Sequence, residues 1–249
     1  MRIKIFILLC LTVIMQFAGV THLKASHYYY KQLSLKDGVT SAVRCILTDK
    51  QGFVWIGTKA GVSRYDGHEL KKYVHSPNNP QSIPNNLIHQ IAEDEMSNIW
   101  ILTDKGIARY QRQSDDFFLP ADEKGNPIIA YSTCLTKDGV LFGSKDKVYF
   151  YSYRDSSLRL LQKLNKGSNF NISLLSLWDE HTVLCCSRWQ GLVLLDLNTG
   201  KHRLPPFDCG KEIMNMLFDS QNRSWIAPYN EGIKCFTHNG ELVKAYTIH

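Results

Sequence analysis

Short apolar runs, each bounded by glycine, aspartate or asparagine, recur along the 249 residues of this chain. The clearest lies between Asp49 and Asp66 and has the sequence DKQGFVWIGTKAGVSRYD. A polar turn precedes an apolar run that ends in Trp-Ile-Gly-Thr, and a second glycine reverses the chain into an alternating Val-Ser-Arg-Tyr segment. Alternating apolar and polar residues between turn formers are typical of β-strands. The stretch therefore predicts two short strands.

The same pattern returns four more times. The second copy, Asp94–Tyr110, keeps the spacing of six residues between aspartate and tryptophan. The third, Asp138–Tyr151, is weaker, the fourth, Val183–Asp196, has lost its tryptophan, and the fifth, Asp219–Phe236, has it again. The aligned positions are Trp55, Trp100, Leu141, Leu184 and Trp225, at successive spacings of 45, 41, 43 and 41 residues.

A period of roughly 40 to 45 residues is compatible with helical arrays and with four-stranded propeller blades. The units contain β-branched and aromatic runs, and none has the i, i+3, i+4, i+7 apolar stripe of an amphipathic helix. We therefore predict an all-β protein, a β-propeller in which about five four-stranded blades are visible. The blades are predicted at about residues 40–76, 86–118, 130–162, 172–204 and 212–249.

The two ends of the repeat bear on the size of the propeller. A lone strand is predicted at Tyr28–Leu35, ahead of the first blade, and the fifth blade has its own outer strand at Glu241–Thr247. In closed propellers the N-terminal strand commonly completes the last blade, which removes an exposed sheet edge. A spare strand without a blade that needs it predicts the N-terminal part of a larger propeller, or a truncated relative of one.

Within the first blade, strands are predicted near Val43–Leu47, Phe53–Gly57, Val62–Tyr65 and Glu69–Val74. The tryptophan of each unit lies on the second strand, where a large apolar side chain packs between neighbouring blades. A glycine after it lets adjacent sheets approach closely. The residues to which we assign this structural role are Trp55, Gly57, Trp100, Gly143 and Trp225.

The repeat resembles the two-component regulator propeller repeat of periplasmic sensor domains in bacterial hybrid two-component systems. That family's pattern is Asp-x-x-Gly-x-Ile/Val-Trp-Ile-Gly-Thr, then Gly-Leu/Val-x-Arg-Tyr-Asp, and residues 49–66 match it nearly letter for letter. The match is good over 94–110, fair over 219–236 and degenerate in the third and fourth units. The resemblance covers about residues 40–249 and implies a ligand-binding propeller whose full-length relatives are histidine kinases.

The first 25 residues predict a secretory signal peptide. Arg2 and Lys4 precede the 16-residue apolar run Ile5–Val20, and Ala25 is a small residue before a cleavage site. The run is shorter than the roughly 20 residues that span a membrane, although an uncleaved anchor is the alternative. We therefore predict a periplasmic protein, tethered to the membrane if it belongs to a full-length receptor.

The remaining residues, 26–249, form the predicted propeller sensor domain and carry 26 basic and 23 acidic residues, a formal charge of +3. No lysine or arginine stripe is present, so nucleic-acid binding by this segment is not expected. Six cysteines leave disulfides open as an alternative. Four of the six fall on predicted strands, which favours buried thiols because free cysteine behaves as a small hydrophobe.

Motifs for catalysis or cofactor binding are missing from the sequence. The chain lacks Gly-x-Ser-x-Gly, His-Glu-x-x-His, the phosphate-binding loop and the dinucleotide fingerprint. No cysteine or histidine spacing resembles a zinc site. We therefore assign no catalytic residue, no metal and no cofactor.

The variable part of the repeat is the turn between its second and third strands. In propellers these turns and the inter-blade connections gather around one mouth of the central channel, where recognition is usually placed. Two turns, 188–190 and 229–231, carry an aromatic ring beside hydrogen-bonding groups, which suits a sugar ring, and an arginine suits a uronate or sulfate. The candidate ligand-binding residues are Lys59, Asp104, Lys105, Arg188, Trp189, Tyr229 and Asn230.

These observations predict a ligand-sensing module that has no kinase activity of its own and is not an enzyme. The carbohydrate nature of the ligand is implied by the resemblance, with an oligosaccharide or another small ligand as the partner. Signalling then requires missing blades and a kinase segment, or a partner chain, and a homodimer stays open. The alternatives are a protein-interaction scaffold and a propeller lyase or hydrolase.

Overall fold

The computed structural model describes residues 42–164, 170–210 and 212–247. These residues belong to the second of two compact units, Ser34–His249. The predicted signal peptide, residues 1–25, and the predicted strand Tyr28–Leu35 lie outside the described residues. Within them, no helix is long and apolar enough to cross a membrane.

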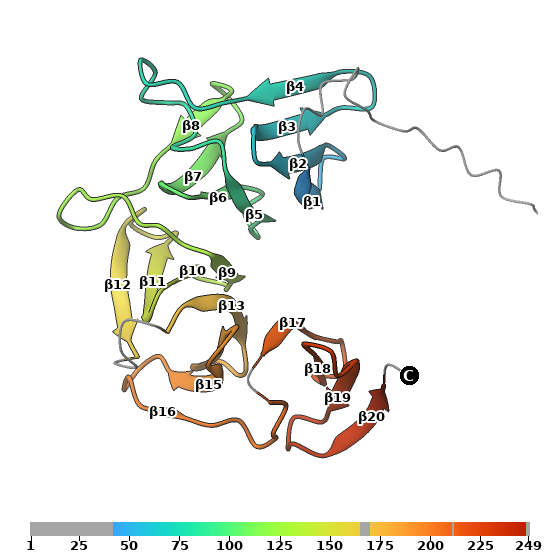
Figure 1. Ribbon diagram of the computed structural model, residues 1–249. Helices are drawn as coiled ribbons and strands as arrows, with labels where there is room; N and C mark the ends of the chain where they lie inside the picture. Colours follow the sequence, from blue (N-terminus) through green and yellow to red (C-terminus); the bar gives the residue numbers. More distant parts are fainter. Residues whose placement is uncertain (1–41, 165–169, 211, 248–249) are drawn as a thin grey trace, which may run out of the picture. The chain divides into compact units, whose positions relative to one another are not determined.

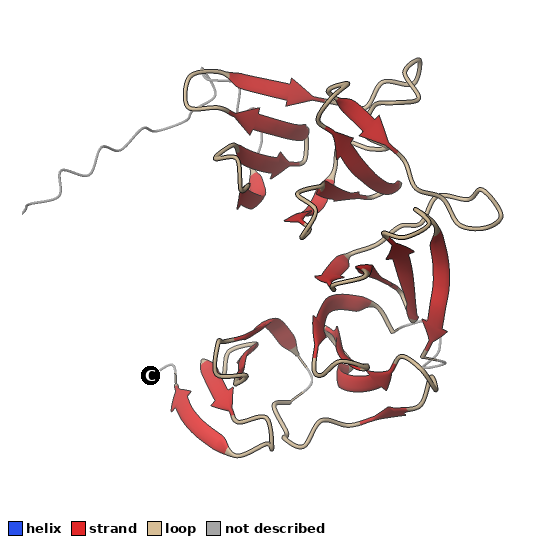
Figure 2. Ribbon diagram, turned by 180° about the vertical axis from the view of Figure 1, so that it is seen from behind, coloured by secondary structure: helices blue, strands red, loops and turns tan. Residues whose placement is uncertain are grey.

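Every regular element in the described part of the chain is a β-strand, and the strands form five separate antiparallel sheets of four (Figures 1 and 2). Each sheet, here called a blade, contains four strands that are consecutive in the sequence and paired in order. The prediction of an all-β propeller with five four-stranded blades is therefore confirmed. In blade 1, the predicted strand ends lie within one residue of the observed ones.

The strands of the first three blades are β1 (Val43–Thr48), β2 (Val54–Thr58), β3 (Gly61–Tyr65) and β4 (Leu70–Tyr73); β5 (Ile88–Glu93), β6 (Ile99–Thr103), β7 (Gly106–Gln111) and β8 (Asp116–Phe118); and β9 (Ser132–Leu135), β10 (Gly139–Ser144), β11 (Lys147–Ser152) and β12 (Leu158–Lys163). Blades 4 and 5 are β13 (Ile172–Leu177), β14 (Thr182–Ser187), β15 (Gly191–Asp196) and β16 (His202–Arg203); and β17 (Ile213–Phe218), β18 (Ser224–Pro228), β19 (Ile233–Phe236) and β20 (Leu242–Tyr246). In each blade, the turns between successive strands are called the A–B, B–C and C–D turns.

The aspartate of the repeat forms the A–B turn and also holds the tryptophan. In blade 1, Oδ1 of Asp49 accepts hydrogen bonds from the backbone N–H groups of Gln51 at 3.0 Å and Phe53 at 2.9 Å. Its Oδ2 accepts the indole Nε1–H of Trp55 at 2.9 Å. The same indole–carboxylate bond joins Trp100 to Asp94 and Trp225 to Asp219, each at 2.8 Å. The six-residue spacing seen in the sequence is thus the spacing of a side-chain hydrogen bond.

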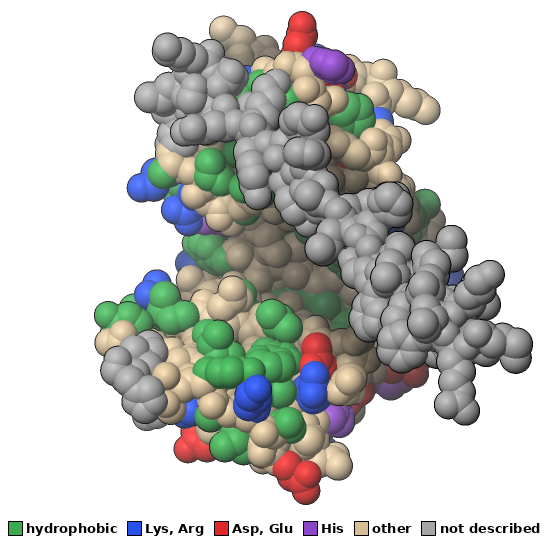
Figure 3. Space-filling model, turned by 90° about the vertical axis from the view of Figure 1, so that its right-hand side faces the viewer, with side chains coloured by type: hydrophobic (Ala, Val, Ile, Leu, Met, Phe, Trp, Pro, Cys, Tyr) green, Lys and Arg blue, Asp and Glu red, His purple; other side chains and the backbone are tan. Residues whose placement is uncertain are grey.

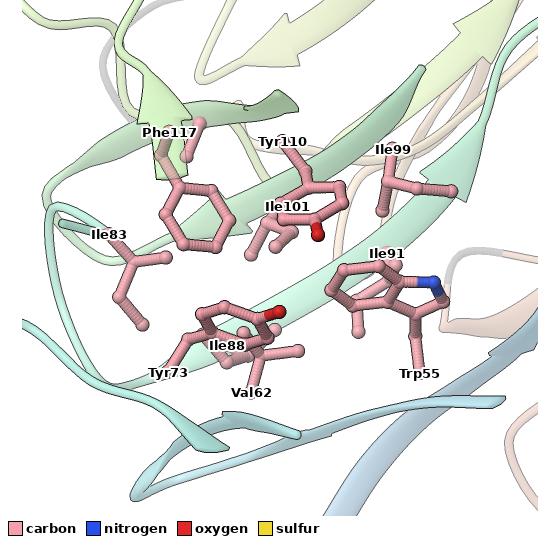
Figure 4. Close-up of a cluster of buried hydrophobic side chains, with 11 residues drawn as sticks. Trp55, Val62, Tyr73, Ile83, Ile88, Ile91, Ile99, Ile101, Tyr110 and Phe117 are labelled. Atoms are coloured by element: carbon pink, nitrogen blue, oxygen red, sulfur yellow. The ribbon is translucent and has the colours of Figure 1, made fainter. Parts of the chain in front are cut away.

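The indole then fills the space between one blade and the next. Trp55 is fully buried, with its ring centre 4.9 Å from that of Tyr110 on blade 2 and 6.0 Å from that of Tyr73 (Figure 4). Trp100 is likewise buried and lies 5.3 Å from Phe142 and 4.8 Å from the ring of a tyrosine on blade 3. Burying rings of this size is a main source of propeller stability, because each removes a large apolar area from water.

Glycine two residues after the tryptophan position allows the next blade to approach. A Cβ atom on Gly57 would lie 2.5 Å from Sγ of Cys45 and 2.8 Å from Cγ2 of Ile88 on blade 2. A Cβ atom on Gly143 would lie 2.6 Å from Cγ2 of Ile172 on blade 4. Both contacts are shorter than carbon atoms tolerate, so a side chain at either position would push the neighbouring blade away.

The six described cysteines are free thiols, and none of them forms a disulfide with another described residue. Cys185, Cys186, Cys209 and Cys235 are buried, and the other two are half-buried. Burial raises the pKa of Cys186 to about 12 and that of Cys45 to about 11. The thiols therefore behave as small apolar side chains, five of them on strands and Cys209 in the connection between blades 4 and 5, as the sequence favoured.

Blade 5 carries its tryptophan differently. Trp225 is only half-buried, and Leu217, directly opposite it on β17, is 57% exposed. Tyr246 stacks on the indole at 6.4 Å and is itself exposed. Figure 3 shows apolar side chains gathered over this part of the molecule. This face corresponds to the face of blades 1 and 2 that is covered by the next blade.

Candidate functional site

The seven predicted ligand-binding residues all lie in B–C turns, and all seven are exposed. Blade 1 contributes Lys59, blade 2 contributes Asp104 and Lys105, blade 4 contributes Arg188 and Trp189, and blade 5 contributes Tyr229 and Asn230. Antiparallel pairing puts the B–C turns at one end of the strands and the A–B and C–D turns at the other end.

Backbone hydrogen bonds link the B–C turns of neighbouring blades through the segment that connects the blades. Between blades 4 and 5, the carbonyl of Arg188 accepts from Ile213 N at 3.0 Å, and Tyr229 N donates to the carbonyl of Glu212 at 2.7 Å. Between blades 1 and 2, Gly61 N donates to the carbonyl of residue 86 and Asp104 N to that of residue 87. Because these bonds link the B–C turns of neighbouring blades, the predicted residues fall into two groups. One group lies on blades 1 and 2, and the other lies on blades 4 and 5.

The group on blades 1 and 2 is polar, and its aspartate already has a partner within the protein. Oδ1 of Asp104 lies 2.8 Å from Nε2 of His89, whose side chain is 14% exposed. The ring of His89 also contacts that of Tyr131, with centres 5.2 Å apart. Lys59 and Lys105 are exposed lysines on their turns. This group offers charges and no exposed aromatic face.

The group on blades 4 and 5 presents the aromatic surface. Trp189 is 63% exposed and Tyr229 is 51% exposed, whereas Trp55 and Trp100 are fully buried. The guanidinium carbon of Arg188 lies 5.0 Å from the centre of the Trp189 ring, a cation–π contact that keeps both groups together at the surface. Asn230 adopts a left-handed backbone conformation with φ of 56°, which makes the sharp turn after Tyr229.

A hollow of about 510 Å³ adjoins the turn 188–190, with Gln190, the sequence neighbour of Trp189, in its wall. Its walls are Gln190, Gly191 and Leu192 on blade 4 and the connection 204–210 between blades 4 and 5. Blade 5 comes close to the connection, because a Cβ atom on Gly210 would lie 3.4 Å from Oε1 of Glu231. Gln190 of the first aromatic turn thus lines the hollow, and Gly210 in its wall lies near Glu231 of the second.

The connection 204–210 was missed as part of a site at the sequence level. It contributes Leu204, which is 73% exposed, two prolines, and Asp208, whose Oδ1 accepts the N–H of Gly210 at 2.9 Å. The signal that could have found it is the Leu-Pro-Pro-Phe sequence itself, a rigid segment between the fourth and fifth repeat units.

The polar cluster with the most perturbed pKa values has a structural position. Asp115, in the C–D turn of blade 2, accepts hydrogen bonds from the hydroxyls of Tyr73 at 2.6 Å and Tyr110 at 2.5 Å, and pairs with Lys71 and Arg64 of blade 1. Partial burial acts to raise the pKa of Asp115, but the bonds from Lys71 and the two tyrosines outweigh it and lower the pKa to about 2. The cluster ties blade 1 to blade 2.

Within the described residues, no group of three or more histidine, cysteine and acidic side chains could hold a metal ion. The arrangement on blades 4 and 5 is instead suited to noncovalent recognition, because it combines a flat apolar face, a fixed cation and amide and carboxylate groups around a hollow.

Comparison with known proteins finds a propeller-repeat family that matches one of the five repeats. Residues 37–60 match the family model "Two component regulator propeller". The resemblance predicted from Asp49–Asp66 is thereby confirmed at the repeat in which it was clearest.

Particular proteins are similar over different lengths. A 59-residue stretch, 23% of this chain and 4% of the relative, is 37% identical to histidine kinase P4 of Formosa agariphila. The extracellular domain assigned to the hybrid two-component system BT3049 of B. thetaiotaomicron superimposes with a TM-score of 0.70 at 20% identity, over 84% of this chain and 30% of that one. Streptogramin B lyase superimposes with a TM-score of 0.62 at 16% identity, over 87% of this chain and 71% of that one. The structural likenesses concern the fold, and this chain spans less than a third of the two-component proteins it matches.

Proposed function

We propose that this chain is the extracytoplasmic ligand-sensing part of a two-component receptor and that it binds a carbohydrate at the B–C turns of blades 4 and 5. The exposed Trp189, which contacts Arg188 and directly precedes Gln190 in the wall of the 510 Å³ hollow, carries the proposal. Matches to a two-component repeat, to a histidine kinase and to the extracellular domain of a hybrid system support the sensory role.

The chemistry of the turns supports a sugar ligand. A pyranose ring presents one apolar face of C–H groups, which packs on an indole or phenol ring, while its hydroxyls require donors and acceptors nearby. Gln190 and Asp208 line the hollow and provide an amide and a carboxylate. Arg188 supplies a fork of N–H donors that matches a uronate carboxylate or a sulfate. We therefore favour an acidic or sulfated oligosaccharide over a neutral one.

Transmission of a signal from this sensor requires a further protein segment or a partner chain. We infer that a kinase segment or partner chain receives the signal and that the apolar face of blade 5, with Leu217 and Tyr246 exposed beside Trp225, is covered by a further blade or by a partner. On this proposal the propeller is a binding module and not an enzyme. Its likeness to streptogramin B lyase is one of fold, at 16% identity.

A thermal-shift screen tests the binding site. The chain is melted with panels of neutral, uronate-containing and sulfated oligosaccharides, because a ligand that binds only the folded state raises the melting temperature. We expect a shift with an acidic oligosaccharide that is lost in Trp189→Ala and reduced in Arg188→Gln. Met96→Ala serves as the matched control, because Met96 is 65% exposed but lies in an A–B turn, at the other end of the strands.

Two results would count against the proposal. If no oligosaccharide shifts a cooperative melt, the carbohydrate function is wrong. If a shift survives Trp189→Ala and is lost in Met96→Ala, the ligand binds at the other end of the blades.

A further inference from the structure

The interfaces between blades 1 and 2 and between blades 2 and 3 share one construction. On blade 2, Arg109 pairs with Trp100 across the strands, lies 6.0 Å from the indole centre and donates a hydrogen bond to the hydroxyl of Tyr151 on blade 3 at 2.8 Å. Trp55 and Arg64 repeat this arrangement on blade 1, with the guanidinium 5.9 Å from the indole. An indole, a guanidinium and a phenol thus fill each interface.

The interface between blades 3 and 4 has lost all these groups. On blade 3, Leu141 pairs with Phe150 on one side and with Cys134 on the other. The tryptophan of blade 2 pairs with Arg109 in the same register. Leucine therefore takes the position of the tryptophan, and phenylalanine takes that of the arginine. Leu195 on blade 4 takes the position of the tyrosine, since it pairs with Val183 as Tyr151 pairs with Val140.

The aspartate that would hold an indole is also replaced. Thr136 is the first residue of the A–B turn in blade 3, where blades 1, 2 and 5 have the tryptophan-bonded aspartate, and its hydroxyl is bonded to Gly139. A leucine is much smaller than an indole. The interface therefore lacks both the ring and its acceptor.

A cavity of about 560 Å³ occupies this interface. Leu141 and Thr136, the two replaced positions, both line it, and Phe150 and Leu177 form apolar walls from the two blades. The volume lies in the range of small-molecule sites, roughly 300 to 1,000 Å³. The apolar part of its lining is Leu141, Phe150, Leu161, Leu177 and Leu197, and an aromatic ring that packs on them gains dispersion contacts.

Blade 4 shows that loss of the strand tryptophan does not by itself leave a cavity. Leu184 occupies the strand position there, but Trp178 in the A–B turn is 5% exposed and fills the interface with blade 5. Its ring stacks on that of His238 at 4.2 Å and lies 6.0 Å from that of Phe207. An aromatic ring is thus supplied from a different position, whereas between blades 3 and 4 aliphatic side chains and Phe150 pack around Leu141, at the base of the cavity.

The rim of the cavity carries charges of both signs. Lys137 and Arg159 are exposed cations, and neither forms an ion pair with a carboxylate among the described residues. The guanidinium of Arg159 lies 5.8 Å from the ring centre of Phe150, at the entrance. Asp138 and Glu180 are exposed carboxylates on the same rim. An apolar pocket with both charges at its mouth is complementary to a ring that carries a zwitterion.

We propose that the cavity between blades 3 and 4 binds an aromatic amino acid, with the ring in the position vacated by the repeat's indole. The ligand's carboxylate faces Arg159 and Lys137, and its ammonium group faces Asp138 and Glu180. This second site lies at the A–B turns, at the opposite strand ends from Trp189, so it goes beyond the carbohydrate function and does not rest on it. A ligand there bridges two blades.

Calorimetric titration of the full chain with L-tryptophan, indole and glycine tests the proposal. Indole is expected to bind through the ring alone, L-tryptophan about tenfold more tightly because of its charges, and glycine not at all. Leu141→Trp fills the cavity and is expected to abolish binding of both ring compounds while melting at or above the wild-type temperature. Arg159→Gln, a surface change, is expected to keep indole binding and remove the advantage of L-tryptophan.

The control is Trp189→Ala, which alters the carbohydrate surface and is expected to leave both titrations unchanged. The proposal is overturned if neither ring compound binds the wild-type chain, or if Leu141→Trp folds and binds them as the wild type does. Equal affinity for indole and L-tryptophan would overturn the assignment of an amino acid. Failure of the oligosaccharide screen leaves these results unaffected, so the two proposals fail separately.

Discussion

Replacing Asp49 with alanine tests whether the indole–carboxylate bond stabilises the blades. The side chain of Asp49 is fully buried and accepts four hydrogen bonds, two from the backbone of its turn, one from Trp55 and one from Arg112 at 3.0 Å. In the alanine variant, water can replace the carboxylate as the acceptor for the half-buried backbone N–H groups of the turn. It cannot reach the indole N–H, because Trp55 is 0% exposed. A buried unpaired donor costs about 1 to 3 kcal/mol and a lost charge-assisted bond a similar amount. We expect Asp49→Ala to lower the free energy of unfolding by about 3 to 5 kcal/mol.

The matched control is Asp219→Ala. Asp219 makes the same bonds to its turn and to Trp225, but its side chain is 20% exposed and Trp225 is half-buried, so water can take over. The expected loss there is smaller than at Asp49. Urea unfolding followed by circular dichroism, with the denaturant dependence unchanged, measures both. Equal losses at the two positions would refute the reasoning.

Asp49→Asn separates the hydrogen bond from the packing. Asparagine has nearly the same shape and its oxygen can keep the turn bonds, but its amide would direct a donor at the donors of Trp55 and Arg112. We expect it to be nearly as destabilising as Asp49→Ala. An almost neutral effect would mean that the space matters and the indole bond does not.

Three further predictions concern other parts of the fold. Gly57→Ala places a carbon 2.5 Å from Sγ of Cys45, and we expect a loss of about 1 to 3 kcal/mol in the same urea assay. Asp115 has its pKa lowered from 3.8 to about 2, so its contribution is complete above pH 4 and is lost as the pH falls through 2. We expect Asp115→Asn to remove about 1 kcal/mol of this acid-dependent stability, allowing for partial exposure, as acid titration of the melting temperature will show. Cys185 and Cys186 are fully buried, so a maleimide should label their peptide only as fast as the chain unfolds, as mass spectrometry will show.

The repeat in the sequence was sufficient to predict the blades, because the same apolar positions recur about every 40 residues, once in each blade. The role of the aspartate was only partly recognised. Asp49 was predicted to lie in a polar turn, whereas the bond from its Oδ2 to Trp55 was not predicted. The constant spacing of six residues could have indicated it, since a turn alone does not require a tryptophan at a fixed distance.

The candidate site was predicted less completely, for a physical reason. Turn residues such as Trp189 can be identified from the sequence because they interrupt the repeat, but a hollow depends on how two blades pack. The connection 204–210 became part of the site only once its position beside the B–C turn was known. Likewise, Leu141 was recognised as a degenerate repeat position, but the cavity it leaves depends on the compensating ring of Trp178 being present at one interface only.

The most direct test of the central claim is hydrogen–deuterium exchange of the chain with and without the oligosaccharide that gives the largest thermal shift. Binding at the B–C turns of blades 4 and 5 predicts slower exchange in residues 188–191, 204–210 and 229–232, and unchanged exchange in the A–B turns. Protection confined to the A–B turns, at residues 49–53, 94–98 and 136–139, would contradict the account.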